Sequence, residues 1–257
     1  MSEWLREFPA MDRESLIAVR KTLDEAYRGF SRAWGADIEA FFQPLLFFLV
    51  WFEKLLIATP WWLVLAIICG LAWLASRSWR IVIGAFVSFL LIGYFGMWED
   101  TMRTMSIILV CTAIAIALGV PIGIAMARSD RTQMLVTPVL DVMQTMPAFV
   151  YLIPVVMLLG IGKVPGVIAV VVYAIAPVIR LTNLGIRLVD RDVLEAADAF
   201  GASAWQRLVG VQVPLAMPTI MAGINQTIMM ALAMVVIASM IGVKGLGQPV
   251  LKSITNQ

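Results

Sequence analysis

The side chains best suited to recognition chemistry lie in a hydrophilic stretch of about 30 residues, from Gly185 to Pro214, between two apolar segments. Asp192 and Glu195 have the spacing of a capping box, in which the first side chain caps a helix and the acid three residues later bonds to the amide of the cap. Gly201 stands where a residue in the left-handed conformation would end that helix. The spacing predicts a short helix between Asp192 and Gly201.

A second short helix is expected directly after the first. Ser203 and Gln206 repeat the capping-box spacing, and we expect Pro214 to stop this helix from continuing. Two capped helices at a fixed angle would form a compact knob, in which small side chains let another protein approach and an aromatic side chain anchors it. The alternative is a well-capped linker without a partner. The side chains expected on the knob are Leu194, Ala196, Ala197, Ala199 and Phe200.

The composition excludes most enzyme classes. Of the 257 residues, 61% are hydrophobic and 14% charged, and the mean hydropathy of +0.91 is far above that of a soluble domain. Histidine is absent, which removes imidazole bases and His-ligated metal sites. Cys69 and Cys111 lie in apolar runs without CxxC spacing. We therefore expect no catalytic residue, no metal site and no nucleic-acid partner, and an intramembrane enzyme is the weakest alternative.

The chain also lacks a phosphate-binding loop of the Gly-x4-Gly-Lys-Ser/Thr type. The nearest approach to it is Gly160-Ile161-Gly162-Lys163, where Met157 replaces the first glycine and Val164 replaces the hydroxyl residue. We expect no cofactor in this chain, and any ATP-driven process would need a separate nucleotide-binding partner.

Apolar stretches recur at intervals of about 20 residues, the length that crosses a ~30 Å hydrocarbon core. The sequence therefore predicts an all-α polytopic membrane protein with about six transmembrane helices. The run Phe41–Thr59 contains Pro44 and the pair Glu53–Lys54, so an interfacial helix suits it better than a span. The expected spans are 61–75, 80–96, 101–127, 139–160, 164–182 and 215–241.

The N-terminal region is more polar than the rest of the chain. Residues 1–40 carry six basic and eight acidic side chains and lack the pattern of a removable signal peptide. Basic residues in short loops mark the cytoplasmic side, and the loops that contain Arg77, Arg128 and Arg187 fall on one side of the predicted spans. We therefore expect the 185–214 stretch in the cytoplasm, the N-terminus outside, and three regions: an amphipathic scaffold at 1–60, peripheral helices at 61–96 and a core at 97–257.

Small residues recur every four positions in the span at 101–127, and such a ridge allows close helix contact in lipid. Packing within one subunit is favoured over a seam between two subunits. The ridge consists of Cys111, Ala115, Gly119, Gly123 and Ala127.

Prolines and amides inside the spans indicate where a path could run. Pro147 and Pro154 each remove a backbone hydrogen bond, which is tolerated in a packing kink or where the backbone lines a cavity. Asn225 and Gln226 lie about 16 Å beyond Pro214, near the midplane, so that one could face a path while the other bonds a neighbouring helix. Asp141 is interpreted as a first-turn acid. The tentative path residues are Gln144, Pro147, Tyr151, Tyr173, Asn225, Gln226 and Met229.

The knob also carries a recognisable motif. Glu195-Ala196-Ala197, then Gly201 after three residues and Val211-Gln212-Val213-Pro214 after nine more, resembles the EAA signature of ABC-importer permeases, with valine in place of the usual isoleucine and leucine. The chain from about Trp98 to Gly247 is similar to the permease of glycine betaine/proline betaine/choline importers. The resemblance implies a type I importer core with coupling helices at about 190–214. It assigns ATPase coupling to Glu195, Ala196, Ala197, Phe200, Gly201 and Pro214.

This resemblance implies a transporter subunit of the bacterial inner membrane rather than an enzyme. Its implied partners are two ATP-binding cassette ATPases, which would bind ATP and Mg²⁺, a second copy of the permease, an extracytoplasmic binding protein and membrane lipids. The expected cargo is glycine betaine, choline or a similar quaternary ammonium, which aromatic faces such as those of Tyr151 and Tyr173 could hold. An amino-acid permease for methionine or proline and a passive channel or mechanosensor are the alternatives.

Permeases of that family continue beyond Gly245-Leu246-Gly247 into a further transmembrane helix. We therefore expect this chain to be truncated or disordered at its end, and the alternative is a protomer that lacks the closing helix.

Overall fold

The computed structural model describes residues 11–255, and within that range every regular element is a helix. Residues 1–10 of the predicted scaffold and residues 256–257 lie outside the described range. Four helical stretches are long and apolar enough to cross a membrane, and a bent pair adds a fifth if it is counted as one span. These findings confirm the predicted all-α polytopic class.

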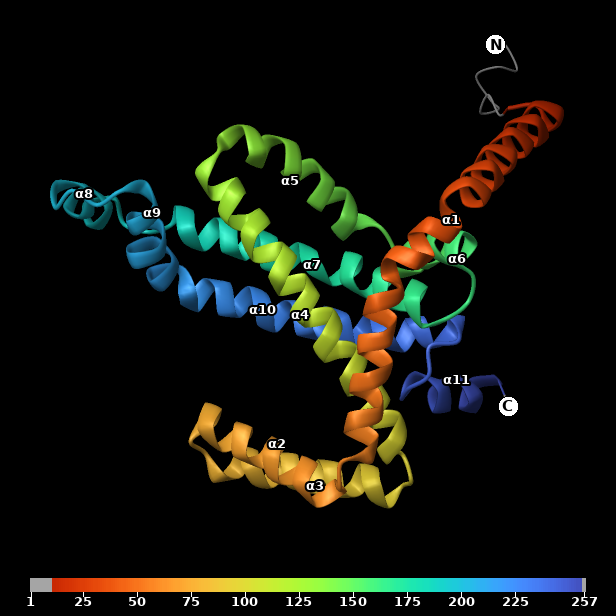
Figure 1. The fold of residues 1–257 in the computed structure, drawn as a ribbon, viewed down its shortest axis with the longest axis horizontal. Coiled ribbons are helices and arrows are strands. Elements are labelled where there is room, and N and C mark those ends of the chain that lie inside the picture. The colour runs from red at the N-terminus through yellow and green to blue at the C-terminus, as the bar shows by residue number, and fades with distance from the viewer. Residues whose placement is uncertain (1–10, 256–257) are drawn as a thin grey trace, which may run out of the picture.

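Three long helices form the centre of the molecule: α4 (Trp98–Arg128), α7 (Lys163–Arg187) and α10 (Val213–Ala238). Helix α7 packs along both α4 and α10 (Figure 1). It is also the most buried of the candidate spans, since 61% of an apolar 18-residue stretch of this helix is buried inside the protein. The core of the bundle is therefore centred on α7.

The ridge of small residues on α4 faces α7 of the same chain. A Cβ atom on Gly119 would lie 2.4 Å from Cγ1 of Val178. On Gly123 it would lie 2.6 Å from Cβ of Thr182 and 2.8 Å from the carbonyl oxygen of Ile179. Since real Cβ atoms do not approach other atoms this closely, only glycine lets the two backbones meet here, and the ridge packs within one subunit as expected.

The prediction of one continuous span at 139–160 is wrong. Helix α5 (Asp130–Thr145) and helix α6 (Ala148–Leu159) meet at an angle of 99°. The break falls at Met146, which is extended with ψ of 133°, because the following Pro147 disfavours the helical conformation in its predecessor. The chain therefore turns at Pro147 instead of crossing straight on.

A side chain from α6 closes this bend. The hydroxyl of Tyr151 donates a hydrogen bond to the carbonyl of Met143 in α5. Asp141 lies well inside α5, since the helix begins at Asp130, so the interpretation of Asp141 as a first-turn acid is wrong. Thr137-Pro138, which suggested a helix start, lies within α5 instead.

Two of the predicted spans are short helices that form a hairpin. Helices α2 (Trp61–Ser76) and α3 (Trp79–Tyr94) have 16 residues each, which corresponds to about 24 Å, less than a ~30 Å hydrocarbon core. Arg77, in the left-handed conformation with φ of 51°, joins them. In Figure 1 the hairpin lies beside the start of α4, apart from the rest of the bundle.

Helix α1 (Arg13–Ala58) is one continuous helix of 46 residues. Pro44 lies inside it on an exposed position and does not break it, contrary to the prediction from the sequence. The part Ala40–Ala58 is long and apolar enough to cross a membrane. In Figure 1, α1 runs at a steep angle to α7 and α10 instead of along them. The interfacial position expected for this segment stays a prediction.

A polar contact also attaches the N-terminal half of α1 to the bent pair. The hydroxyl of Tyr27 donates to the carbonyl of Pro154 in α6 at 2.5 Å. Burial raises the pKa of Tyr27, so the hydroxyl remains a donor at neutral pH.

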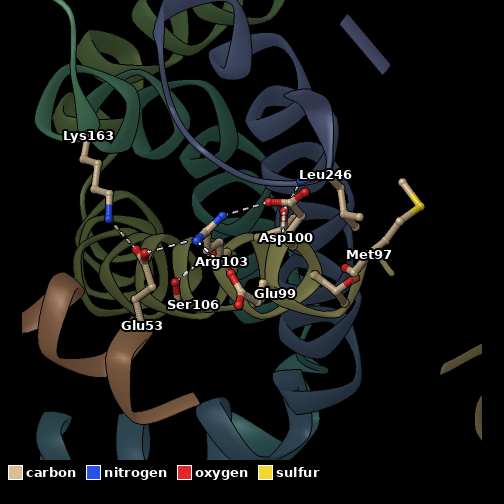
Figure 2. A network of polar contacts seen from close by, with 10 residues as sticks. Glu53, Met97, Glu99, Asp100, Arg103, Ser106, Lys163 and Leu246 are labelled. Atoms are coloured by element: carbon tan, nitrogen blue, oxygen red, sulfur yellow. Dashed lines mark hydrogen bonds and ion pairs between the residues drawn. The ribbon is translucent and has the colours of Figure 1, made fainter. Parts of the chain in front are cut away.

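At the opposite end of the bundle from α8, an ionic cluster joins α1, α4 and α7 (Figure 2). The carboxylate of Glu53, which is 9% exposed, lies 2.5 Å from Nζ of Lys163 and 3.8 Å from Nε of Arg103. Arg103 also pairs with Glu99 and Asp100 on its own helix at 3.1 and 3.0 Å. Glu53 therefore attaches the apolar part of α1 to the core together with Leu49, which is buried in the main apolar cluster.

The last described helix, α11 (Gly247–Thr255), follows a loop that returns to the same region. The amide of Leu246 donates to Oγ1 of Thr104 in α4 at 2.9 Å (Figure 2). A Cβ atom on Gly245 would lie 2.5 Å from that hydroxyl oxygen, so the close approach requires glycine.

Replacing Gly123 by alanine should loosen the contact between α4 and α7. The added methyl group would meet the backbone of Ile179, which cannot move aside, so we expect the protein to lose about 1–3 kcal/mol of stability. Thermal unfolding in detergent measures this loss. Gly84→Ala in α3 is the matched control, because a Cβ there meets nothing within 4 Å. Equal unfolding temperatures for the two variants would contradict the packing described here.

Glu53→Gln should weaken the attachment of α1. Lys163 would keep no carboxylate partner among the described residues, and losing one member of a partly buried pair costs roughly 1–3 kcal/mol. We expect faster proteolysis within α1 and a lower unfolding temperature. The neighbouring exposed Lys54, changed to glutamine, is the control and should behave like the wild type. If Glu53→Gln is as resistant as Lys54→Gln, the cluster does not hold α1.

Candidate functional site

The predicted knob is present as two short helices, α8 (Arg191–Ala199) and α9 (Ala204–Arg207). The first begins differently from the prediction: Asp190, not Asp192, is its N-cap, and the Asp190 carboxylate accepts from the amide of Asp192 at 3.0 Å. The helix starts earlier because the Asp190 side chain satisfies a free amide of its first turn. Glu195 then lies five residues after the N-cap instead of three, too far along the helix to complete a capping box.

The carboxylate of Glu195 is therefore not used by a capping box. Glu195 is exposed and makes no hydrogen bond or ion pair within residues 11–255. An acidic side chain left without an internal role on a surface helix is available to a partner.

The connection between the two helices forms as predicted. Gly201 has φ of 78°, its amide bonds to the carbonyl of Asp198 at 2.9 Å, and the amide of Ala202 bonds to that of Ala197 at 3.1 Å. These two bonds complete a Schellman motif, which needs a residue in the left-handed conformation. Ser203 and Gln206 then form the expected capping box, with bonds of 2.8 and 3.4 Å.

Two contacts fix the knob to itself and to the bundle. Nη1 of Arg207 lies 2.6 Å from a carboxylate oxygen of Asp198, so α9 is held against α8. Leu208, only 2% exposed, packs with Ile186 of α7 and Ile220 of α10. The knob is therefore a rigid extension of the two central helices instead of a loose linker.

The prediction that Pro214 ends the second helix is wrong. After α9 the chain continues through a π-helical turn, Leu208–Gln212, directly into α10. Pro214 stands in the first turn of α10, where a missing amide hydrogen has little cost. The knob and the span at 213–238 therefore form one continuous rod.

Two aromatic side chains dominate the surface of the knob. Phe200 is 93% exposed and Trp205 is 66% exposed. Ala196 is also exposed, and Ala197 is half-buried. The sequence analysis identified Phe200 but not Trp205; its position in the same capped stretch was the signal that could have found it. Exposed aromatic rings at the tip of a rigid element are typical of a protein-binding surface.

The tentative path residues divide into two groups. Gln144, Pro147, Asn225, Gln226 and Met229 are exposed on the isolated chain. Neither the side chain of Asn225 nor that of Gln226 makes a hydrogen bond within the described residues, so the bond to a neighbouring helix that was expected for one of them is not formed inside this chain. Both amides point out of the single bundle.

The two tyrosines are internal instead. The rings of Tyr151 and Tyr173 pack edge to face with centroids 5.8 Å apart, and Tyr151 is only 8% exposed. Because the Tyr151 hydroxyl already bonds to Met143 across the bend, this pair stabilises the α5–α6 corner. Its faces are not open in the described structure for holding a cation.

A bundle of apolar helices that presents a rigid, capped knob at one end and unpaired amides along one span defines a membrane transport subunit that docks with another protein. The match to known sequences specifies it further. Residues 119–257 match the family described as binding-protein-dependent transport system inner membrane component, and the chain belongs to that family. The resemblance inferred from the Glu195–Pro214 motif is thereby confirmed.

The relatives are transport permeases. The chain is 50% identical over 190 residues to the glycine betaine/carnitine transport permease protein GbuB of Listeria monocytogenes, covering 73% of this chain and 67% of the relative. It is 49% identical over 211 residues to the glycine betaine/proline betaine transport system permease protein ProW of Escherichia coli, covering 82% and 59%.

A third relative matches over most of its length. The glycine betaine transport system permease protein OpuAB of Bacillus subtilis is 42% identical over 245 residues, covering 95% of this chain and 86% of the relative. This chain therefore spans between 59% and 86% of these three relatives. The family consists of transport subunits, in agreement with the prediction that the chain is not an enzyme.

Proposed function

We propose that this chain is the membrane permease of an ATP-driven importer for a quaternary-ammonium compatible solute such as glycine betaine or choline. The observation that carries the proposal is 42–50% identity to permeases named for glycine betaine transport. The family match at residues 119–257 includes the whole knob. These relatives favour a betaine-type cargo over methionine or proline, and they favour an energised permease over a channel or mechanosensor.

The knob is the surface through which a separate ATPase acts on the permease. Glu195 and Phe200 project from it without internal partners, and the rod from α9 into α10 offers a mechanical connection from the knob to the membrane. The ATPase would bind ATP and Mg²⁺, since this chain carries no phosphate-binding loop. An extracytoplasmic binding protein would deliver the cargo.

Two permease copies and two ATPases make up the functional unit. Amides exposed to hydrocarbon are costly, so Asn225 and Gln226 require a polar environment that one chain does not supply. A second copy of the chain, related by a two-fold axis, would enclose a path along α10 with these amides and Met229 on its wall. Gln144 and Pro147 would line the same path from the bent pair.

The chain lies in the bacterial inner membrane with the knob in the cytoplasm and the N-terminus outside. Arg128, Arg187 and Arg207 all lie at the end of the bundle that carries α8, which is the distribution expected at a cytoplasmic face. Figure 1 shows the N-terminal end of α1 on the far side of the bundle from α8, which supports the same orientation.

Gly201→Val should uncouple the ATPase from the path. A branched side chain is strained at φ of 78°, so the Schellman motif would open and displace Phe200. We expect ATPase association and solute uptake to fall at least ten-fold while membrane insertion stays normal. Glu195→Ala should reduce both in the same direction without disturbing the fold of the knob.

Gly210→Val provides the matched control. Gly210 lies nearby in the π-helical turn at a negative φ, and a Cβ there meets nothing within 4 Å. If Gly201→Val and Glu195→Ala both show wild-type uptake and ATPase association, the assignment of the knob fails.

The cargo and the stoichiometry can be tested on one preparation. We expect vesicles that contain the permease, its ATPase and its binding protein to accumulate glycine betaine only when ATP is present. Native mass measurement of the same complex should give two permease chains for each transporter. Uptake of methionine but not of betaine would refute the cargo, and a single permease chain in an active complex would refute the dimer.

A further inference from the structure

An ion pair inside the membrane-spanning part of the bundle has no role in the proposal above. The guanidinium of Arg180 in α7 bonds through Nη2 to the carboxylate of Asp141 in α5. Arg180 lies seven residues before the end of α7 at Arg187, about 10 Å from it along the helix axis. Ionisable side chains at such a depth are costly and usually serve a path or a site.

Arg180 lines a cavity of about 340 Å³ between α4, α5 and α7, and its partner Asp141 follows the lining residue Leu140 in α5. Gln133 and Thr137 of α5 and Asn183 of α7 supply polar groups to its wall, while Met126 and Leu184 supply apolar surface. This combination of apolar walls with a few polar groups and one charge is typical of a site for a small molecule, and the volume is at the lower end of the ~300–1,000 Å³ range of ligand pockets.

The polar groups of this cavity are incompletely paired. Nε of Arg180 is buried and has no hydrogen-bond partner in the described part of the chain. The amide oxygen of Asn183 accepts from Nε of Arg187 at 3.1 Å, which leaves its amide nitrogen without an acceptor among residues 11–255. The cavity therefore offers unpaired hydrogen-bond donors, and the carboxylate of Asp141 is joined to it through the guanidinium of Arg180.

We propose that Arg180 and Asp141 are a binding site for the two charged ends of a zwitterionic cargo. The carboxylate of the cargo binds the guanidinium of Arg180, and its quaternary ammonium lies against the carboxylate of Asp141. The inference rests on the proposed function and makes it more specific, because it distinguishes zwitterions such as glycine betaine from plain cations such as choline.

Charge balance favours a zwitterion at this position. Opening the pair without a ligand would leave two uncompensated charges in a region of low dielectric constant, which is strongly unfavourable. A zwitterion that enters between Arg180 and Asp141 gives each of them a new partner and keeps the net charge unchanged. Choline can pair only with Asp141 and leaves the guanidinium of Arg180 without an anion.

The exchange also changes how α5 is held. Only one residue of α5, Leu140, is buried, and two arginines of α7 bridge to this helix. One bridge is Arg180–Asp141 and the other is Arg187–Asp130 at 2.7 Å. When a cargo separates the first pair, α5 keeps only the second bridge at that face of α7, so occupancy of the site loosens the bent pair from the core.

The test uses the complex of the full chain with its ATPase in lipid nanodiscs, without the binding protein. Glycine betaine and choline are titrated separately, and the dissociation constants are measured by saturation-transfer NMR. We expect the wild type to bind glycine betaine about ten-fold more tightly than choline, as the loss of a charge-assisted hydrogen bond implies. Arg180→Gln should weaken glycine betaine binding about ten-fold and should not weaken choline binding, because in the variant choline no longer leaves a guanidinium without an anion.

Asp141→Asn supplies the second half of the test, and we expect it to weaken both ligands because both carry the quaternary ammonium. The exposed Arg80, changed to glutamine, is the control for charge and should bind as the wild type does. Unchanged betaine binding in Arg180→Gln, an equal loss of both ligands in that variant, or no betaine binding by the wild type would each overturn the site.

Parallel uptake measurements with the wild type separate this inference from the proposed function. If wild-type vesicles do not import betaine at all, the proposed function fails. If they import it but the Arg180→Gln complex binds it normally, only the Arg180–Asp141 site fails.

Discussion

The structure depends on the close approach of α7 to its two neighbours. Between apolar helices in lipid the hydrophobic effect supplies no force, so the contact must come from dense packing. Gly123 brings α4 onto the backbone at Ile179, and Gly223 brings α10 within 3.2 Å, measured from its ideal Cβ, of the Cα of Val178. Because α7 is packed between α4 and α10, the charged residues at its two ends, Lys163 and Arg187, are held in place and can bind other helices.

Those charged ends organise the peripheral helices. Lys163, at the start of α7, holds α1 through Glu53, while Arg187, at its end, holds α5 through Asp130. The Lys163–Glu53 pair is partly shielded from solvent, where an ion pair is worth more than at an open surface, whereas Asp130 of the other pair is largely exposed. Each pair adds to apolar packing, since Leu49 of α1 and Leu140 of α5 are buried in the core. The core therefore positions α1 and the bent pair through apolar packing together with charges, and the charges can exchange partners more readily than packed side chains can.

The parts of the chain that lack internal partners are the parts that its function uses. Phe200 and Trp205 cover no other surface of this chain, and Asn225 and Gln226 find no hydrogen bond in it. The backbone groups of the helices are satisfied internally, so these side chains are what the chain leaves free for other chains. In the proposed function they would contact an ATPase at the knob and a second permease along α10. The rod from α9 to α10 joins the two surfaces directly.

The sequence by itself determined the features that depend on neighbouring residues. Gly201 and the Ser203–Gln206 box follow from hydrogen bonds over three to five positions, and the lengths of the apolar stretches in α4, α7 and α10 follow from the thickness of a bilayer.

Tertiary structure decided the rest. Competition between Asp190 and Asp192 for one cap, the 99° turn at Pro147 and the contact of Arg180 with Asp141, 39 residues apart, depend on which surfaces meet, and no local spacing encodes that. Proline shows the difference clearly. Pro44 lies inside a long helix without breaking it, Pro214 stands in the first turn of α10, and Pro147 follows the break after α5. The residue type is the same at each position, and the surroundings determine whether the chain bends.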